Sequence, residues 1–188
     1  DLNLQNLLKV SLKDVPIVDL SSLEHSKEIT HFSLIKGASK YLPSFVGFDS
    51  LRELYVKNTP IIDLSPLENL VGLENLTLIN VKAKELPGLG NAKSLTEIRL
   101  ERFELENLEG LSEVYSLEKL WFHYVPVSDL RPLTYLTNLE TVYLVETHID
   151  NYIGLYRENY SISIYSKYNQ YLHCDDPSGV YGYNWTRV

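Results

Sequence analysis

The sequence predicts an α/β repeat solenoid, a right-handed superhelix with a parallel β-sheet on its concave face and short 3₁₀ or extended segments on its convex face. Three observations predict this fold. Aliphatic residues recur every 22 positions from Leu7 to Leu139 without an insertion, each recurrence begins the same L-x-x-L-x-L spacing, and a second apolar set follows at a fixed distance. Such periods are typical of stacked repeats, in which each unit buries its apolar edge against the next.

The first half of each unit has the pattern of a strand. Its two apolar positions are separated by one residue, and the side chains of a strand alternate between its two faces. We therefore expect seven parallel strands whose apolar pairs point inward. The first position of the pair holds Val10, Phe32, Leu54, Leu76, Ile98, Leu120 and Val142, and the second holds Leu12, Leu34, Val56, Leu78, Leu100, Phe122 and Leu144.

The second half of each unit is too short for an α-helix. Its apolar residues are spaced by three, starting at Leu20, Leu42, Leu64, Leu86, Leu108 and Leu130. This spacing predicts short 3₁₀ turns or extended segments. Pro66 and Pro132, with Gly88 and Gly110 at the equivalent positions, fit a tight turn at the start of that segment.

The clearest copies of the unit are Asp63-Leu64-Ser65-Pro66-Leu67 and Asp129-Leu130-Arg131-Pro132-Leu133, each continued by two further leucines spaced by three. They resemble the 22-residue leucine-rich repeats of bacterial internalins and of the phosphatase-regulator class, over roughly residues 4–158. The resemblance implies a leucine-rich repeat superhelix. That family usually has Asn three residues after the last strand leucine. Here an apolar or threonine stack is expected instead, because this position holds Val15, Gly37, Thr59, Val81, Phe103, Val125 and Thr147.

The two ends depart from the regular repeat. The sequence begins partway through a unit, and we expect about seven 22-residue units over residues 1–158. After Leu155 the spacing fails, although Ile162 and Ile164 still alternate as in a last strand. Residues 159–188 are predicted to form a capping segment that ends in a hairpin, because residues 175–179 carry a strong turn signal between two apolar runs.

Composition narrows the class of partner. A formal net charge of −8 argues against nucleic acid, which is bound through surplus Lys and Arg, and it fits a basic protein partner. No apolar run reaches the ~20 residues that a membrane-spanning helix needs. Cys174 is the single cysteine, which excludes an intrachain disulfide and favours a reducing compartment or a bacterial source. The compartment stays open between the bacterial surface, secretion and the cytoplasm.

Binding residues are predicted on the outward positions of the strands. The position between the inward pair holds small residues early in the chain and Arg99, Trp121 and Tyr143 on adjacent later strands. These three should form one continuous patch, because neighbouring strands lie ~4.8 Å apart, and aromatics and Arg dominate interface hot spots. A purely structural reading, in which the three side chains pack across the strands, stands beside it. The full predicted set is Tyr55, Arg99, Glu101, Arg102, Trp121, His123, Tyr124, Tyr143 and Glu146.

We expect no enzyme activity, no metal and no cofactor. The run His173-Cys174-Asp175-Asp176 contains metal-ligating residue types, but adjacent strand residues point to opposite faces and lack the spacing of a zinc site. A Cys-His nucleophile pair there would have neither an orienting third group nor an oxyanion hole. The sequence also has no Gly-rich phosphate loop and no Ser-His-Asp signature.

The leading hypothesis is a non-enzymatic protein–protein interaction module that binds a protein partner through its concave sheet face. A bacterial recognition protein at the surface and an intracellular regulator both fit this hypothesis. The alternative is a structural repeat spacer within a larger surface or secreted protein, which a sequence beginning in mid-repeat favours. The third class is an enzyme with its site around His173 and Cys174, which Cys174→Ser would test.

Overall fold

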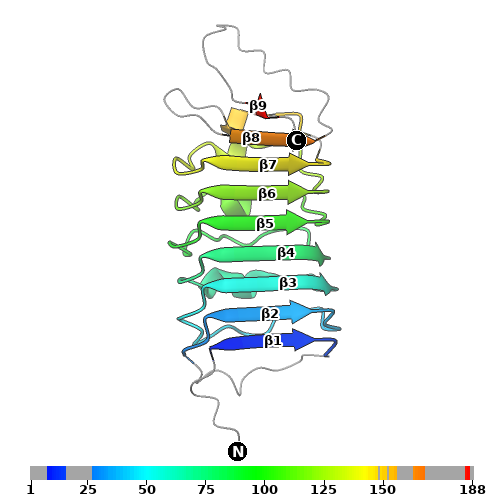
Figure 1. The fold of residues 1–188 in the computed structure, drawn as a ribbon, viewed down its shortest axis with the longest axis vertical. Coiled ribbons are helices and arrows are strands. Elements are labelled where there is room, and N and C mark those ends of the chain that lie inside the picture. The colour runs from blue at the N-terminus through cyan, green and yellow to red at the C-terminus, as the bar shows by residue number, and fades with distance from the viewer. Residues whose placement is uncertain are drawn as a thin grey trace, which may run out of the picture.

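The computed structural model describes residues 8–15, 27–147, 149–151, 153–155, 163–167 and 185–186, the last two segments by their backbone alone. These residues form one parallel sheet of nine strands that follow one another in chain order (Figure 1). The strands are β1 (Lys9–Lys13), β2 (His31–Ile35), β3 (Glu53–Thr59), β4 (Asn75–Val81), β5 (Glu97–Glu101), β6 (Lys119–His123), β7 (Thr141–Val145), β8 (Ser163–Lys167) and β9 (Trp185–Thr186).

The register of the sheet confirms the 22-residue period. Each pairing from β1 to β8 joins residues 22 positions apart, as in Trp121 with Tyr143 and Thr141 with Ser163. Equal positions of successive units therefore lie in straight columns across the sheet. All seven expected strands are present, and β3 and β4 run two residues further than the others, to Thr59 and Val81.

The core lies between the sheet and the return segments, which are the second halves of the units and lead from the end of one strand to the start of the next. The two apolar positions of each strand from β1 to β7 point into it, and from β2 to β7 both are buried. Each buried aliphatic or aromatic side chain contributes about 1.5–3 kcal/mol relative to an exposed one. In the second unit, Phe32, Phe45 and Phe48 pack edge to face with ring centroids 5.6–6.3 Å apart.

Short 3₁₀ helices form on the return side, as the three-residue spacing predicts. They are η2 (Ser65–Asn69), η3 (Glu109–Leu111), η4 (Arg131–Leu133) and η5 (Ile153–Leu155). Pro66 and Pro132 occupy the first turn of η2 and η4. Gly110 is required in η3, because a Cβ there would overlap the carbonyl oxygens of Leu86 and Pro87 in the preceding unit.

A column of Asp and Asn side chains explains where these helices begin. Asp63 accepts a hydrogen bond from the backbone N–H of the residue two positions on, at 2.8 Å, and Asn107, Asp129 and Asn151 accept the equivalent bond at 2.9–3.0 Å. Short Asp and Asn side chains favour this turn. Glu85 occupies the same column, and residues 82–89 form no helix.

At the carboxyl end of each strand from β1 to β7, one residue is in the left-handed backbone region; it directly follows β1, β2, β5, β6 and β7 and is the second-last residue of β3 and β4. Their φ values lie between 48° and 57°, and the residues are Asp14, Lys36, Asn58, Asn80, Arg102, Tyr124 and Glu146. The next column is the one in which an apolar or threonine stack is expected. Its residues are buried from Gly37 to Thr147, and Val15 is half-buried, so the stack is present.

The sheet continues past residue 158. β8 pairs with β7 at the same 22-residue offset, and Ile164 of β8 pairs with Trp185 of β9 in a parallel arrangement. The predicted hairpin around residues 175–179 lies outside the described residues. The division of the chain at residue 158 stays a prediction.

Candidate functional site

Alternate residues of β5, β6 and β7 form a grid on the outer face of the sheet. Register aligns the three strands, so that Arg99, Trp121 and Tyr143 form the middle row. All of the grid residues are exposed or half-buried, whereas the residues between them on each strand are buried. The other two rows are Glu97, Lys119 and Thr141, and Glu101, His123 and Val145.

Trp121 and Tyr143 stack face to face. Their ring centroids are 5.1 Å apart and their planes differ by 2°. Aromatic pairs of this kind contribute about 0.5–1.5 kcal/mol beyond their buried area. The stack gives Trp121 a structural role and leaves it half-buried. Cross-strand packing is therefore present, and the remaining exposed ring surface is what a partner could contact.

Glu101 is the electrostatic centre of the patch. Its carboxylate lies 3.4 Å from a guanidinium nitrogen of Arg99, 3.0 Å from one of Arg102, and 3.7 Å from Nδ1 of His123. The Glu101 side chain is only 13% exposed, whereas those of Arg99 and Arg102 are 54% and 59% exposed. One nearly buried carboxylate thus fixes two cationic side chains that remain open to solvent.

The turn after β6 extends the patch at the carboxyl end of the strands. The rings of His123 and Tyr124 stack with centroids 4.6 Å apart. The guanidinium carbon of Arg102 lies 5.6 Å from the centroid of the Tyr124 ring, a cation–π contact. Glu146 occupies the equivalent position in the turn after β7, one 22-residue unit beyond Tyr124.

Tyr55 does not join this group. It lies on β3, two strands from Arg99, with Thr77 of β4 between them. On β4, Ile79 lies at an outward position of the strand and yet is only 6% exposed. Its register neighbours are Lys57 and Glu101, whose long side chains can cover apolar surface.

Four residues of the grid were not among the predicted site residues, namely Glu97, Lys119, Thr141 and Val145. Lys119 donates a hydrogen bond to Glu97 at 2.6 Å across the β5–β6 pair. The hydrogen bond and the charge of Glu97 raise the pKa of Lys119. The period-2 alternation that selects Trp121 also selects Lys119, so this signal was available in the sequence.

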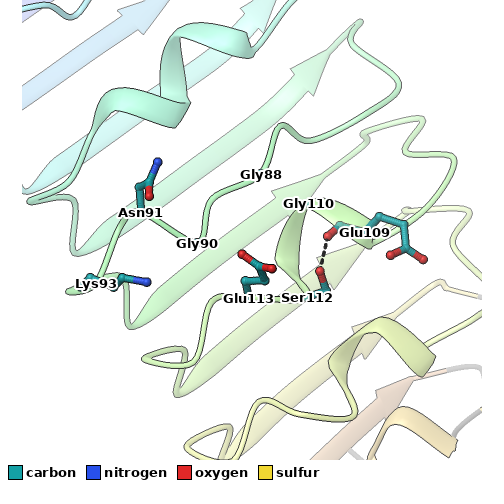
Figure 2. A pocket seen from close by; sticks show the side chains of 8 residues that line it. All are labelled: Gly88, Gly90, Asn91, Lys93, Glu109, Gly110, Ser112 and Glu113. Carbon is teal, nitrogen blue, oxygen red and sulfur yellow. Dashed lines mark hydrogen bonds between the residues drawn. The ribbon is translucent and has the colours of Figure 1, made fainter.

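The return side carries a small hollow of a different kind (Figure 2). It measures about 170 Å³ and is lined mainly by glycines and polar residues of two successive units, namely Gly88, Gly90, Asn91, Lys93, Glu109, Gly110, Ser112 and Glu113. Ser112 donates its hydroxyl proton to the carbonyl oxygen of Glu109 at 2.7 Å. Within the described ranges, no cluster of three or more His, Cys, Asp or Glu residues could hold a metal ion. Cys174 lies outside those ranges.

The chain is a leucine-rich repeat solenoid, because its 22-residue units form one parallel sheet and the two apolar residues of each strand from β2 to β7 are buried. Two solved structures from Listeria monocytogenes are similar to it. Internalin C2 has a TM-score of 0.74 at 25% identity, over 87% of this chain and 72% of that one. Internalin F has a TM-score of 0.59 at 20% identity, over 78% of this chain and half of that one.

No family model and no curated protein matches the sequence. The resemblance to internalins that the repeat predicts is confirmed by the fold of the two similar solved structures. Both of those proteins are bacterial. In the part of the chain that the structure describes, no helix is long and apolar enough to cross a membrane.

Proposed function

We propose that this chain is a non-enzymatic protein-binding module that holds a protein partner against the outer, concave face of its sheet, around Arg99, Trp121 and Tyr143. The stacked Trp121–Tyr143 pair beside the Glu101-centred cations carries the proposal. Trp, Tyr and Arg are the residue types that dominate binding energy in protein interfaces.

The scaffold suits this role because the patch is held in place before a partner arrives. Its residues lie on three hydrogen-bonded strands, and Glu101 fixes Arg99 and Arg102 by ion pairs. Side chains that are already ordered lose less conformational entropy on binding. The internalin-like fold supports an interaction role, and the net charge of −8 favours fast encounter with a partner that is basic overall.

The test is a pull-down with three purified proteins: the wild type, Arg99→Ala/Trp121→Ala, and Tyr135→Ala as a control. Tyr135 is 73% exposed and lies on the return side, so its loss removes an exposed aromatic away from the patch. We expect wild type and Tyr135→Ala to retain the same partner and the double variant to lose it. The partner is then identified and its affinity measured with purified protein.

Equal recovery of the same partner by the double variant and the wild type would refute the proposal. Circular dichroism of both proteins must show the same folded signal, so that a loss of binding is not a loss of fold. A spacer with an inert surface predicts no partner that distinguishes the two proteins.

A further inference from the structure

Within the proposed site, the group formed by Arg99, Glu101 and Arg102 has an excess of positive charge, although the formal net charge of the chain is −8. Arg99 and Arg102 both contact Glu101, so two full cations share one carboxylate. Lys119 adds nothing to the excess because it pairs with Glu97. We propose that the partner places the carboxylate of an Asp or Glu side chain on Arg99 and Arg102, and an apolar side chain beside it on Trp121. This inference rests on the proposed function.

The two guanidinium groups have free donors for such a group. A guanidinium carries five N–H donors, and in each arginine a single nitrogen contacts Glu101. More than half of each side chain is open to solvent. Glu101 itself is 13% exposed, so it orients the two arginines and leaves their remaining donors to an incoming carboxylate. Arginine binds carboxylates through paired, charge-assisted hydrogen bonds.

Charges further away do not cancel the excess. The outward and turn residues of the neighbouring strand β4 are uncharged at Thr77, Ile79 and Asn80. Glu146 lies two units beyond Arg102 in the turn column, about 10 Å away at the spacing of strands. At physiological salt the Debye length is about 8 Å, so the total charge guides approach while the nearest charges decide the contact.

The geometry also sets where the apolar residue of the partner stands. Trp121 is one strand from Arg99 and Tyr143 is two strands away, which corresponds to about 5 and 10 Å. An extended peptide advances about 3.3 Å per residue. A partner segment that crosses the strands would therefore carry its acidic residue one to three positions from an aromatic or aliphatic residue.

A random 12-residue peptide display library tests this inference, with the wild-type chain as bait. We expect the selected peptides to carry Asp or Glu within three positions of an aromatic or aliphatic residue. The best peptide is then synthesised together with its Glu→Gln or Asp→Asn analogue, and both are titrated by fluorescence anisotropy. The acidic peptide should bind the wild type about tenfold more tightly than the neutral analogue, as one charge-assisted pair provides.

Two double variants locate the effect. Arg99→Gln/Arg102→Gln should bind the two peptides within twofold of each other. Lys36→Gln/Lys57→Gln removes the same charge from the same edge of the sheet, three and two units before Arg102 and Glu101, and should keep the tenfold preference. Selection of basic or uncharged peptides, failure to select any peptide, or a preference that survives in Arg99→Gln/Arg102→Gln would overturn the inference.

A third variant separates this inference from the proposed function. Trp121→Ala should weaken the acidic peptide and its neutral analogue alike, because it removes the apolar contact that both share. If Trp121→Ala binds both peptides as tightly as the wild type does, the outer face is not the binding face and the proposed function fails. If Trp121→Ala loses them while the acidic preference is absent, only the acidic partner is excluded.

Discussion

Thr59→Val should stabilise the protein, although it replaces a residue at the end of a central strand. Thr59 closes β3 and is 3% exposed. Its hydroxyl is buried, and among the described residues it has no hydrogen-bond partner. The next residue in the column is Val81, which pairs with Thr59 in the sheet. Valine has nearly the same shape as threonine and brings no polar group into this apolar stack.

The size of the gain follows from the cost of that hydroxyl. A buried polar group without a partner costs about 1–3 kcal/mol. For a protein of this length, 1 kcal/mol corresponds to a shift of about 2–4 °C in Tm. We therefore expect Thr59→Val to raise the free energy of unfolding by about 1–2 kcal/mol and the Tm by about 2–8 °C. Urea denaturation followed by far-UV circular dichroism should show a higher midpoint with an unchanged m-value.

Thr147→Val is the matched control. Thr147 occupies the same column and is 2% exposed, but its hydroxyl donates to the carbonyl oxygen of Val145 at 3.2 Å. That carbonyl also accepts a bond from the amide of Tyr124, so it is not orphaned by the change. Thr147→Val should lose about 0.5–1.5 kcal/mol. If Thr59→Val gains nothing over the wild type, its hydroxyl is satisfied in solution and the reasoning is wrong.

Three further tests, which use five substitutions, address other parts of the structure. Gly110→Ala should cost about 1–3 kcal/mol in urea denaturation because its Cβ meets backbone carbonyls, whereas Gly88→Ala, whose Cβ meets open space, should stabilise by about 0.4–1 kcal/mol. Hydrogen bonds from the backbone amide and the hydroxyl of Ser65 lower the pKa of Asp63 below its ordinary value of 3.8. The ionised Asp63 carboxylate stabilises the folded state at pH values above its unfolded-state pKa, and this stabilisation is lost as the pH falls through its folded-state pKa. Asp63→Asn should therefore reduce the difference between the urea midpoints at pH 7 and pH 3. An unchanged difference contradicts this reasoning. Tyr124→Asn and Lys36→Asn should both relieve left-handed backbone strain and gain up to about 1 kcal/mol, but only Tyr124→Asn should weaken partner binding; equal binding by both would remove Tyr124 from the site.

The repeat allowed the sheet to be predicted strand by strand. A fixed period with no insertion determines the register as well as the strands, because equal positions must stack for the apolar edges to be buried. Alternation then determines which side chains face outward, and this is why Arg99, Trp121 and Tyr143 were found together. Alternation does not predict exposure, as Ile79 shows, because burial on the outer face depends on the neighbouring side chains.

The arrangement inside the site could not be predicted from the pattern. Glu101 was selected as one outward residue among several, but its role as the shared partner of Arg99 and Arg102 depends on rotamers and on distances of 3–4 Å. The Asp and Asn column at the start of the 3₁₀ helices had a local signal in Asp63 and Asp129. That the whole column accepts a hydrogen bond from the backbone N–H two residues on becomes clear only from the structure, in which Asn107 accepts the same bond as Asp63 and Asp129.

The left-handed column bears on the choice between binding and packing. Asn58 and Asn80 are residue types that tolerate this backbone region, and their side chains hydrogen-bond to each other at 3.0 Å. The next three units carry Arg102, Tyr124 and Glu146 instead, at a cost of roughly 1–2 kcal/mol each.

Strain of this kind persists where other requirements outweigh it, and it often collects at functional sites. Lys36 shows that one strained residue is not enough to mark a site, since it lies far from the patch and has only a weak exposed pair with Asp14 at 3.9 Å. Three in succession beside Trp121 are different. Asn tolerates this backbone region better than the residue present at each of these positions. Arg102 and Tyr124 contact Glu101, His123 and each other within the patch, and partner binding as proposed above would be a further reason for side chains of these types.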